Sequence, residues 1–265
     1  MASNRHIPAP VAREVRQRCG FCCVLCGQPI VEYEHMIPFA DVQEHNASDI
    51  TLLCSQCHRK KTSGLISVDA IREADQNPYM KSCEKSAPEM FSYPNNLPYL
   101  LEVGSCGLMI AHPHVNEIDA IVIDSVSFLK LKNDKGRLLL SIAVTDRMGR
   151  PLVVIIDNVL QVYPDAWDIV FQGTTLEVRQ DPIGTRPFSR LNVNPEGVFI
   201  DRWETTHNGK TIRVRDDGGV SLEPDGGEIS RCFKSIYPPL DTQGNPIGPP
   251  VSAVGVIHDG LGLRW

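Results

Sequence analysis

Residues 23–27 read Cys-Val-Leu-Cys-Gly, and residues 54–58 read Cys-Ser-Gln-Cys-His. Each block separates two cysteines by two residues, a spacing at which a tight turn directs both thiolates to one metal ion. Gly27 follows the first pair, where a sharp backbone turn favours a residue without a Cβ atom. Two such pairs can surround Zn²⁺ tetrahedrally at about 2.3 Å. The pattern predicts a structural zinc site formed by Cys23, Cys26, Cys54 and Cys57.

Cys19 and Cys22 form a competing pair with the same spacing. This pair lacks a following glycine, and its use would leave Cys23 and Cys26 without a metal. Six of the nine cysteines lie between Cys19 and Cys57. An odd, clustered set without a secretion signal favours metal binding over disulfides. Because four thiolates leave no coordination position open for water, we expect the zinc to stabilise the module and the chemistry to occur elsewhere.

The 27 residues between the two cysteine pairs contain a second pattern. Glu34-His35-Met-Ile-Pro38 lies inside this segment, and Asp49-Ile-Thr-Leu-Leu53 runs directly into the second pair. Arginines precede the first pair, and Arg59-Lys60-Lys61 follows His58. In this order and spacing, residues 13–62 resemble the HNH (ββα-metal) endonucleases of the zinc-knuckle type.

The resemblance implies a metal-dependent endonuclease that hydrolyses DNA phosphodiester bonds. His35 would act as the general base, a role suited to a side chain that titrates near neutral pH. Glu34 and His58 would bind one catalytic divalent ion, Mg²⁺ or another, against the scissile phosphate. Asp49 would belong to the loop that carries the base. Members of this family serve in restriction, phage defence and mobile-element biology.

Two positions depart from the family pattern. Glu34 stands where an aspartate is usual, and the longer side chain requires the ion or the strand to shift. Asp49 stands where an asparagine is usual, so the acceptor oxygens remain and the amide donor is lost, with Asn46 as a substitute. Adjacent residues of a regular strand point to opposite faces, so we expect Glu34 and His35 to lie in irregular backbone.

Basic residues on either side of this segment are candidates for DNA contact. Arg59, Lys60 and Lys61 follow the second pair, and Arg16 and Arg18 precede the first. The net charge is −6, yet residues 1–66 carry a balance of +1 and the remainder a balance of −7. We therefore expect a local contact with the DNA backbone rather than a broad basic surface.

The chain changes character along its length. Residues 10–18 predict a helix that begins at Pro10 and stops at Gly20, and residues 67–75 predict another with Ser67 as N-cap. Four prolines punctuate residues 76–98. We predict an α+β protein with three parts: an HNH module over residues 1–66, a helix and proline-rich connector over residues 67–98, and an all-β domain over residues 99–265.

The predicted all-β domain consists of short apolar or alternating runs separated by turn residues such as Asn194-Pro-Glu-Gly197, Asn208-Gly209 and Asp217-Gly-Gly219. A sandwich, a barrel and a solenoid remain open. The domain would serve recognition, sensing or assembly and would contact a ligand or protein that the sequence does not identify. The predicted strands are 120–126, 138–144, 152–156, 211–215 and 220–223.

Two other functions fit the same residues. A non-catalytic zinc module would bind DNA or a protein, and a sensor version of the all-β domain would restrain the nuclease until a ligand arrives. No apolar run is long enough for a membrane helix, and the N-terminus lacks a signal peptide, so we expect a cytoplasmic protein without membrane contact. A nuclease with one active site must dimerise or act twice to break both strands, which makes a homodimer one expectation.

Overall fold

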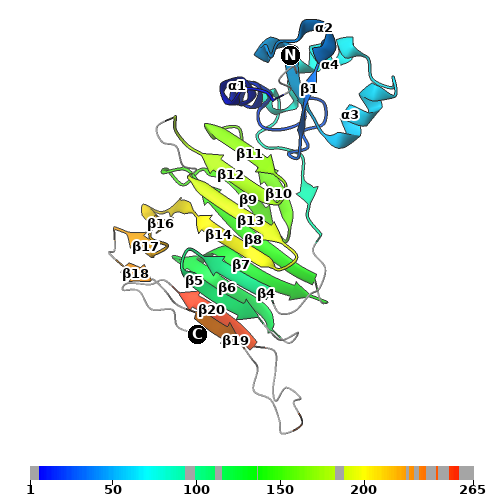
Figure 1. Ribbon diagram of the computed structural model, residues 1–265. Coiled ribbons are helices and arrows are strands. Elements are labelled where there is room, and N and C mark those ends of the chain that lie inside the picture. The colour runs from blue at the N-terminus through cyan, green and yellow to red at the C-terminus, as the bar shows by residue number, and fades with distance from the viewer. Residues whose placement is uncertain are drawn as a thin grey trace. The chain divides into compact units, whose positions relative to one another are not determined.

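The computed structural model describes residues 6–92, 99–110, 115–135, 137–182, 188–224, 227–229, 233–236, 243 and 251–256. The chain divides into two compact units, drawn in Figure 1. Unit 1 comprises Met1–Glu89, Leu160–Phe171 and Arg179–Ile183, and unit 2 comprises Met90–Val159, Gln172–Val178 and Gly184–Trp265. Residues 93–98 of the predicted connector lie outside the described residues, as do parts of the predicted all-β domain.

Helices dominate the described N-terminal residues, and strands dominate the described residues after about position 88, which confirms the α+β class. Among the described residues, every helix is too short or too polar to cross a membrane. The N-terminal elements are α1 (Ala9–Cys19), β1 (Glu32–His35), α2 (Phe39–Val42), η1 (Ala47–Asp49), β2 (Ile50–Leu53), α3 (Ser55–Thr62), α4 (Val68–Gln76) and η2 (Tyr79–Lys81).

Both predicted helices are confirmed, and each has the predicted end signal. Helix α1 contains Pro10 in its first turn and ends at Gly20, whose φ of 69° is the left-handed conformation that glycine adopts without strain. Helix α4 begins after Ser67, whose Oγ accepts a hydrogen bond from the Ala70 amide at 3.1 Å. This cap satisfies one of the amides that lack a partner within the helix.

The core of the N-terminal module forms around the two-stranded antiparallel sheet β1-β2. Every residue of β2 is buried. Ile50, Leu52 and Leu53 belong to one apolar cluster with Val15 of α1 and Ile71 of α4. Burial of an aliphatic side chain of this size contributes about 1.5–3 kcal/mol, so β2 ties both helices to the hairpin.

The described strands of unit 2 form antiparallel and parallel pairs and lie in three sheets. One contains the order β20-β6-β7-β8-β9, one the order β12-β13-β14-β4-β5-β19, and the third has four strands in the order β15-β16-β17-β18. The bounds are β4 Tyr99–Val103, β5 Cys106–Ile110, β6 Val115–Ile123, β7 Val126–Asp134, β8 Arg137–Thr145, β9 Pro151–Ile156, β12 Thr175–Arg179, β13 Ser189–Asn194, β14 Gly197–Arg202, β15 Glu204–His207, β16 Lys210–Val214, β17 Val220–Glu223, β18 Gly227–Ile229, β19 Phe233–Ile236 and β20 Val251–Val256.

The predicted turns separate strands of unit 2 as expected. Asn208 and Gly209 both have positive φ, at 48° and 77°, and connect β15 to β16 in the two-residue hairpin that this dipeptide favours. The predicted turn at residues 217–219 lies in the 215–219 connection between β16 and β17, and residues 195–196 connect β13 to β14.

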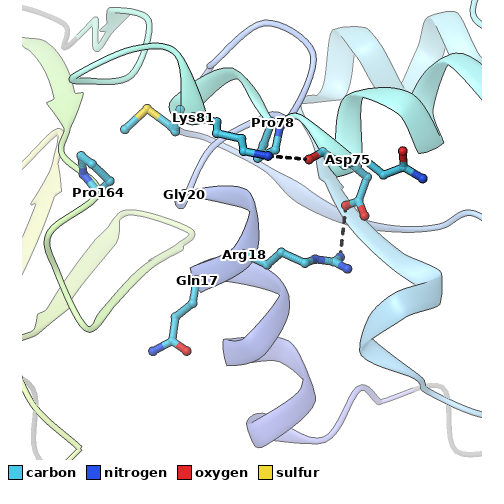
Figure 2. Close-up of a pocket in the computed structure, with 9 residues that line it drawn as sticks. Gln17, Arg18, Gly20, Asp75, Pro78, Lys81 and Pro164 are labelled. Atoms are coloured by element: carbon cyan, nitrogen blue, oxygen red, sulfur yellow. Dashed lines mark hydrogen bonds and ion pairs between the residues drawn. The ribbon is translucent and has the colours of Figure 1, made fainter.

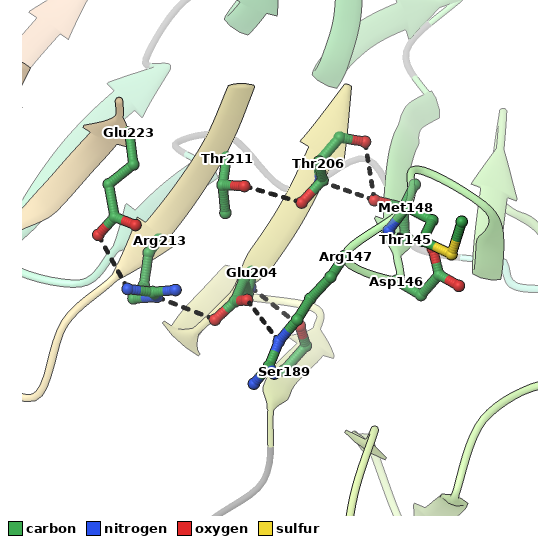
Figure 3. A network of polar contacts seen from close by, with 10 residues as sticks. All are labelled: Thr145, Asp146, Arg147, Met148, Ser189, Glu204, Thr206, Thr211, Arg213 and Glu223. Atoms are coloured by element: carbon green, nitrogen blue, oxygen red, sulfur yellow. Dashed lines mark hydrogen bonds and ion pairs between the residues drawn. The ribbon is translucent and has the colours of Figure 1, made fainter. Parts of the chain in front are cut away.

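A polar network ties β15 and β16 to the end of β8 (Figure 3). The Thr145 Oγ1 atom accepts a hydrogen bond from the Thr206 amide at 2.7 Å and lies 3.0 Å from the Thr206 carbonyl. Arg213 donates to Glu204 at 2.9 Å and to Glu223 at 2.8 Å. Because every group in this network already has a protein partner, we assign it a structural role in unit 2.

Candidate functional site

The thiols of Cys23, Cys26, Cys54 and Cys57 form a four-cysteine cluster, and their sulfur atoms all lie within 4.8 Å of one another. The Cys26 and Cys54 sulfurs are 3.6 Å apart, and those of Cys26 and Cys57 are 3.7 Å apart. Four thiolates about 2.3 Å from a tetrahedral ion lie about 3.8 Å from one another. The sulfur positions therefore fit one zinc ion.

Burial disfavours the charged thiolate form at two of these cysteines. It raises the pKa of Cys26 to about 11, and it raises the pKa of Cys57 as well. Burial alone would also raise the pKa of Cys54, but the hydrogen bond from the Cys57 amide and those from neighbouring thiols hold it below the ordinary value. Zinc binds thiolates, so a bound dication would supply the charge stabilisation that burial removes.

The competing pair, Cys19 and Cys22, does not belong to the four-cysteine cluster. The Cys19 sulfur lies 3.7 Å from Thr51 Oγ1 and 3.8 Å from Asp75 Oδ1, and Cys22 is fully buried. Gly27 has a φ of 75°, and a Cβ atom there would lie 2.4 Å from the Tyr79 ring, so both its conformation and its surroundings require glycine. The predicted division between the two pairs agrees with this arrangement.

The four-cysteine cluster also fixes the start of helix α3. Cys54 is the N-cap of α3, and its sulfur accepts a hydrogen bond from the Cys57 amide at 3.4 Å. His58 lies in the first turn of this helix, and its amide donates to the Cys54 carbonyl at 2.8 Å. A zinc ion bound to Cys54 and Cys57 would therefore hold the histidine that follows them.

Glu34 and His58 come together, and we refer to them as the Glu34–His58 pair. His58 Nε2 lies 2.7 Å from Glu34 Oε2, and Lys61 Nζ lies 2.6 Å from Glu34 Oε1. The Glu34 side chain is 7% exposed, whereas that of His58 is 40% exposed. The carboxylate thus lies beneath the surface and the imidazole opens to solvent. One oxygen and one nitrogen ligand suit a divalent ion that keeps water molecules.

The expectation of irregular backbone at Glu34 and His35 is wrong. Both belong to strand β1, and they pair in register with Thr51 and Ile50 of β2. Their side chains alternate, with Glu34 buried and His35 half-buried. The hairpin continues to the last residue of β1 because β2 is fully buried and keeps its register, and irregular backbone begins only after His35.

His35 lies in a small aromatic cluster. Its Nε2 atom lies 3.2 Å from His45 Nδ1, and its ring meets Phe39 edge-on at a centroid distance of 5.5 Å. Phe39 and His45 stack at 4.6 Å. Partial burial and the neighbouring His45 lower the pKa of His35, while Glu34 and Asp49 oppose the change. A lowered pKa favours the neutral imidazole, the form that can accept a proton.

Asp49 contacts the loop after His35 through its backbone. The Asp49 carbonyl accepts a hydrogen bond from the Met36 amide at 2.8 Å, and its amide donates to the Asn46 carbonyl at 3.0 Å. Its carboxylate accepts from the Asn46 side-chain amide at 3.4 Å. Asn46 and Asp49 therefore lie together, and the Asp49 backbone is linked to Met36, the residue after His35.

Arg16 forms a buried ion pair within unit 1. Its Nε and Nη2 atoms donate to the two oxygens of Asp168 at 2.7 and 2.6 Å, and it also contacts the Tyr33 hydroxyl. The side chains of Arg16 and Asp168 are only 13% and 2% exposed. Arg13 lies over the Trp167 ring at 4.2 Å. Helix α1 therefore holds residues 160–171 within unit 1.

Arg18 is also paired within unit 1. It donates to the Ile50 carbonyl at 2.6 Å and forms an ion pair with Asp75 at 3.1 Å. Figure 2 shows this pair at the wall of an open cavity of about 540 Å³. The cavity is lined by Gln17, Arg18, Gly20, Asp75, Gln76, Pro78, Met80, Lys81 and Pro164.

The predicted DNA contacts on α3 differ from one another. Arg59 and Lys60 are exposed, whereas Lys61 turns back to Glu34. The sequence did not predict three contacts of the candidate residues: His45 and Phe39 lie beside His35, and Asp168 pairs with Arg16. A stacked Phe–His contact and a pairing across 152 residues leave no local motif, so only the folded chain reveals them.

A family model described as HNH endonuclease matches residues 23–64. The match contains the four-cysteine cluster, the Glu34–His58 pair and the basic residues of α3. It confirms the resemblance to the HNH endonucleases over this segment and indicates a nuclease or other nucleic-acid function with a metal site. No curated protein and no solved structure matches the chain.

Proposed function

We propose that this protein is a metal-dependent endonuclease that hydrolyses phosphodiester bonds in DNA. The observation that carries the proposal is the 2.7 Å approach of Glu34 and His58. These two metal-ligand side chains come from β1 and α3 within the segment matched by the HNH family.

His35 is the general base in this proposal. Its ring is half-buried, and its pKa lies below the ordinary value because of burial and His45, so it is neutral near neutral pH. A neutral imidazole takes a proton from an attacking water at a ring nitrogen. The hydrogen bond between the Met36 amide and the Asp49 carbonyl holds the backbone beside it, which would limit the drift of the ring.

Glu34 and His58 are the ligands of the catalytic divalent ion, Mg²⁺ or a related ion. Such an ion would neutralise charge on the scissile phosphate and its leaving oxygen. Glu34 supplies a negative oxygen from beneath the surface, and His58 supplies a nitrogen from the solvent side. The four-cysteine cluster is the site of a structural zinc ion, which would keep His58 in place through the start of α3.

Arg59 and Lys60 are the residues that we assign to the DNA backbone. Both are exposed on α3, close in sequence to His58, and phosphate contacts of this kind set register without reading sequence. Arg16 and Arg18 act instead as structural residues in this proposal, because each already pairs with a carboxylate. A cytoplasmic location, a homodimer and a recognition or sensing role for the all-β domain stay predictions.

The proposal is tested by cleavage of supercoiled plasmid by the zinc-loaded full chain with Mg²⁺, Mn²⁺ or EDTA. We expect nicking that requires the divalent ion and that falls by about 10²–10⁴-fold in His35→Ala. The matched control is His207→Ala, which removes a histidine of unit 2 and should cleave like the wild type. End-group analysis should find 5′-phosphate and 3′-hydroxyl products.

Equal cleavage by His35→Ala and the wild type would contradict the assignment of the base. If the zinc-loaded wild type binds DNA but does not cleave it with any of the divalent ions tested, the protein is better explained as a non-catalytic zinc module. The replacements at Glu34 and Asp49 are the sequence features that favour this second reading.

A further inference from the structure

The second oxygen of Glu34 carries an interaction that metal binding does not explain. Lys61 Nζ lies 2.6 Å from Glu34 Oε1, while His58 Nε2 lies 2.7 Å from Oε2. Glu34 is almost fully buried, at 5% exposure, so its charge needs a compensating partner. Lys61 supplies that partner from inside the same site.

The geometry of α3 makes this contact possible. His58 and Lys61 are three residues apart on one helix, a spacing that places both on the same face. The Lys61 side chain is 25% exposed, whereas Lys60 beside it is exposed and has no contact with Glu34 among the described ion pairs. Lys61 therefore extends from Glu34 to the protein surface.

A lysine and a divalent cation cannot both lie against this carboxylate without a large repulsion. Unlike a histidine ligand, an ammonium has no lone pair to offer the ion. The positive charges of the ammonium and the dication also repel each other, so Lys61 against Glu34 weakens binding of the ion. The carboxylate binds the ion more tightly once Lys61 has moved away, and the flexible four-carbon stem of the lysine permits this movement.

We propose that Lys61 is a displaceable counter-charge that couples ion binding at the Glu34–His58 pair to DNA binding. This rests on the proposed function. Without DNA, the ammonium stays on Glu34 and weakens binding of the ion. With DNA, a backbone phosphate attracts Lys61, and the carboxylate becomes available to the ion. By linkage, the ion strengthens DNA binding by the same factor.

Mn²⁺ binding tests this proposal, measured by the electron paramagnetic resonance signal of the free ion. The zinc-loaded full chain carries His35→Ala so that a short DNA duplex remains intact. We expect Lys61→Met to bind Mn²⁺ at least about tenfold more tightly than the parent without DNA. DNA should tighten Mn²⁺ binding to the parent by about 5–150-fold, and the gain should be smaller in Lys61→Met.

Three variants make the result interpretable. Lys85→Met removes an exposed lysine outside α3, which pairs with Gln161, and should leave Mn²⁺ affinity unchanged. Lys61→Gln removes the charge and keeps a hydrogen-bond donor, so it should still bind Mn²⁺ more tightly than the parent even if Lys61→Met fails to fold. Glu34→Ala should lose the site.

Equal or weaker Mn²⁺ binding by both Lys61 variants, with loss of binding in Glu34→Ala, would overturn the proposal and leave Lys61 a structural ion pair. A purely structural role predicts weaker binding, because Glu34 would lose its support. If Glu34→Ala binds Mn²⁺ as well as the parent, Glu34 is not a ligand of the ion. This result would refute both the proposed function and the coupling.

Discussion

The four-cysteine cluster and the Glu34–His58 pair lie in the same short segment, yet their surroundings differ. The cluster supplies four sulfur atoms within 4.8 Å of one another, which is a complete tetrahedral set. The pair supplies one oxygen and one nitrogen, and the His58 side chain is 40% exposed. A complete set of four ligands stabilises a fold, whereas an incomplete set beside solvent leaves positions for water and substrate.

Helix α3 connects the two sites. It follows its N-cap Cys54, contains Cys57 in its first turn, and carries His58 and Lys61 toward Glu34. A defect in the cluster should therefore damage both sites, while a defect in the Glu34–His58 pair should leave the cluster intact. Substitutions in the cluster should accordingly have larger effects than substitutions in the pair.

Loss of zinc should have the largest effect. Structural zinc contributes about 10–16 kcal/mol of apparent folding free energy in small zinc modules. This equals or exceeds the whole stability of many domains. Cys57→Ser should therefore lose zinc and unfold the N-terminal module, as judged by zinc content and protease sensitivity. Cys83→Ser, outside the cluster, is the control, and a fully folded zinc-free protein would refute the structural role.

The buried ion pair of α1 should have the next largest effect. Removing one partner leaves a buried charge, so Asp168→Asn should lower the free energy of unfolding of unit 1 by about 3–5 kcal/mol. Chemical denaturation measures this change. Asp69→Asn breaks an exposed pair with Arg72 and should change stability by less than about 1 kcal/mol. Equal changes in the free energy of unfolding in the two variants would show that the buried Arg16–Asp168 pair contributes no more to stability than an exposed pair.

The contact between α1 and Asp168 affects the design of any truncation experiment. Asp168 belongs to unit 1 although it lies far along the chain. Cutting the chain after residue 98 would therefore remove Asp168 and Trp167 from α1. Higher activity of such a fragment would still indicate restraint by the all-β domain, but lower activity would reflect loss of this contact.

The Glu34–His58 pair should respond in function more than in stability. His58→Ala should reduce cleavage at least about a hundredfold, because it removes a ligand of the charge-stabilising ion. It should lower the free energy of unfolding by no more than about 2 kcal/mol, since Lys61 still pairs with Glu34. Plasmid cleavage and a thermal melt measure the two quantities. If His58→Ala were unfolded, the Glu34–His58 pair would be needed for stability in the same way as the four-cysteine cluster.

The exposed basic residues should have the smallest effect. Lys60→Ala should weaken DNA binding evenly across sequences and reduce the slope of log affinity against log salt by about 1. Lys85→Ala is the control, because Lys85 pairs with Gln161 and lies outside α3. Fluorescence anisotropy at several salt concentrations measures the slope. An unchanged slope would remove Lys60 from the DNA-binding surface.

Local sequence signals predicted local structure well. Pro10 and Gly20 delimit α1, Ser67 caps α4, and Asn208-Gly209 forms a hairpin, because each depends on backbone conformations that these residues favour. The spacing of the cysteines likewise predicted which four thiols come together, since a knuckle is a local structure.

Contacts between distant segments were not predictable in this way. Nothing near Arg16 indicates that Asp168 will neutralise it, and the basic character of α1 was interpreted as a DNA contact. Sheet order in unit 2 depends on which strands bury which faces, which alternation alone does not specify. The strand at Glu34 and His35 was also mispredicted, because the burial of β2 that maintains its register is a tertiary effect.

In the function that we propose, one segment of the chain holds a structural zinc ion and a separate catalytic ion. The most direct test measures zinc content and plasmid cleavage in one sample, freed of other divalent ions and then given Mg²⁺ or Mn²⁺. We predict one zinc per chain throughout and cleavage only after the addition, lost in His35→Ala. Cleavage by the zinc-loaded protein before any addition, or cleavage that survives in His35→Ala, would contradict the account.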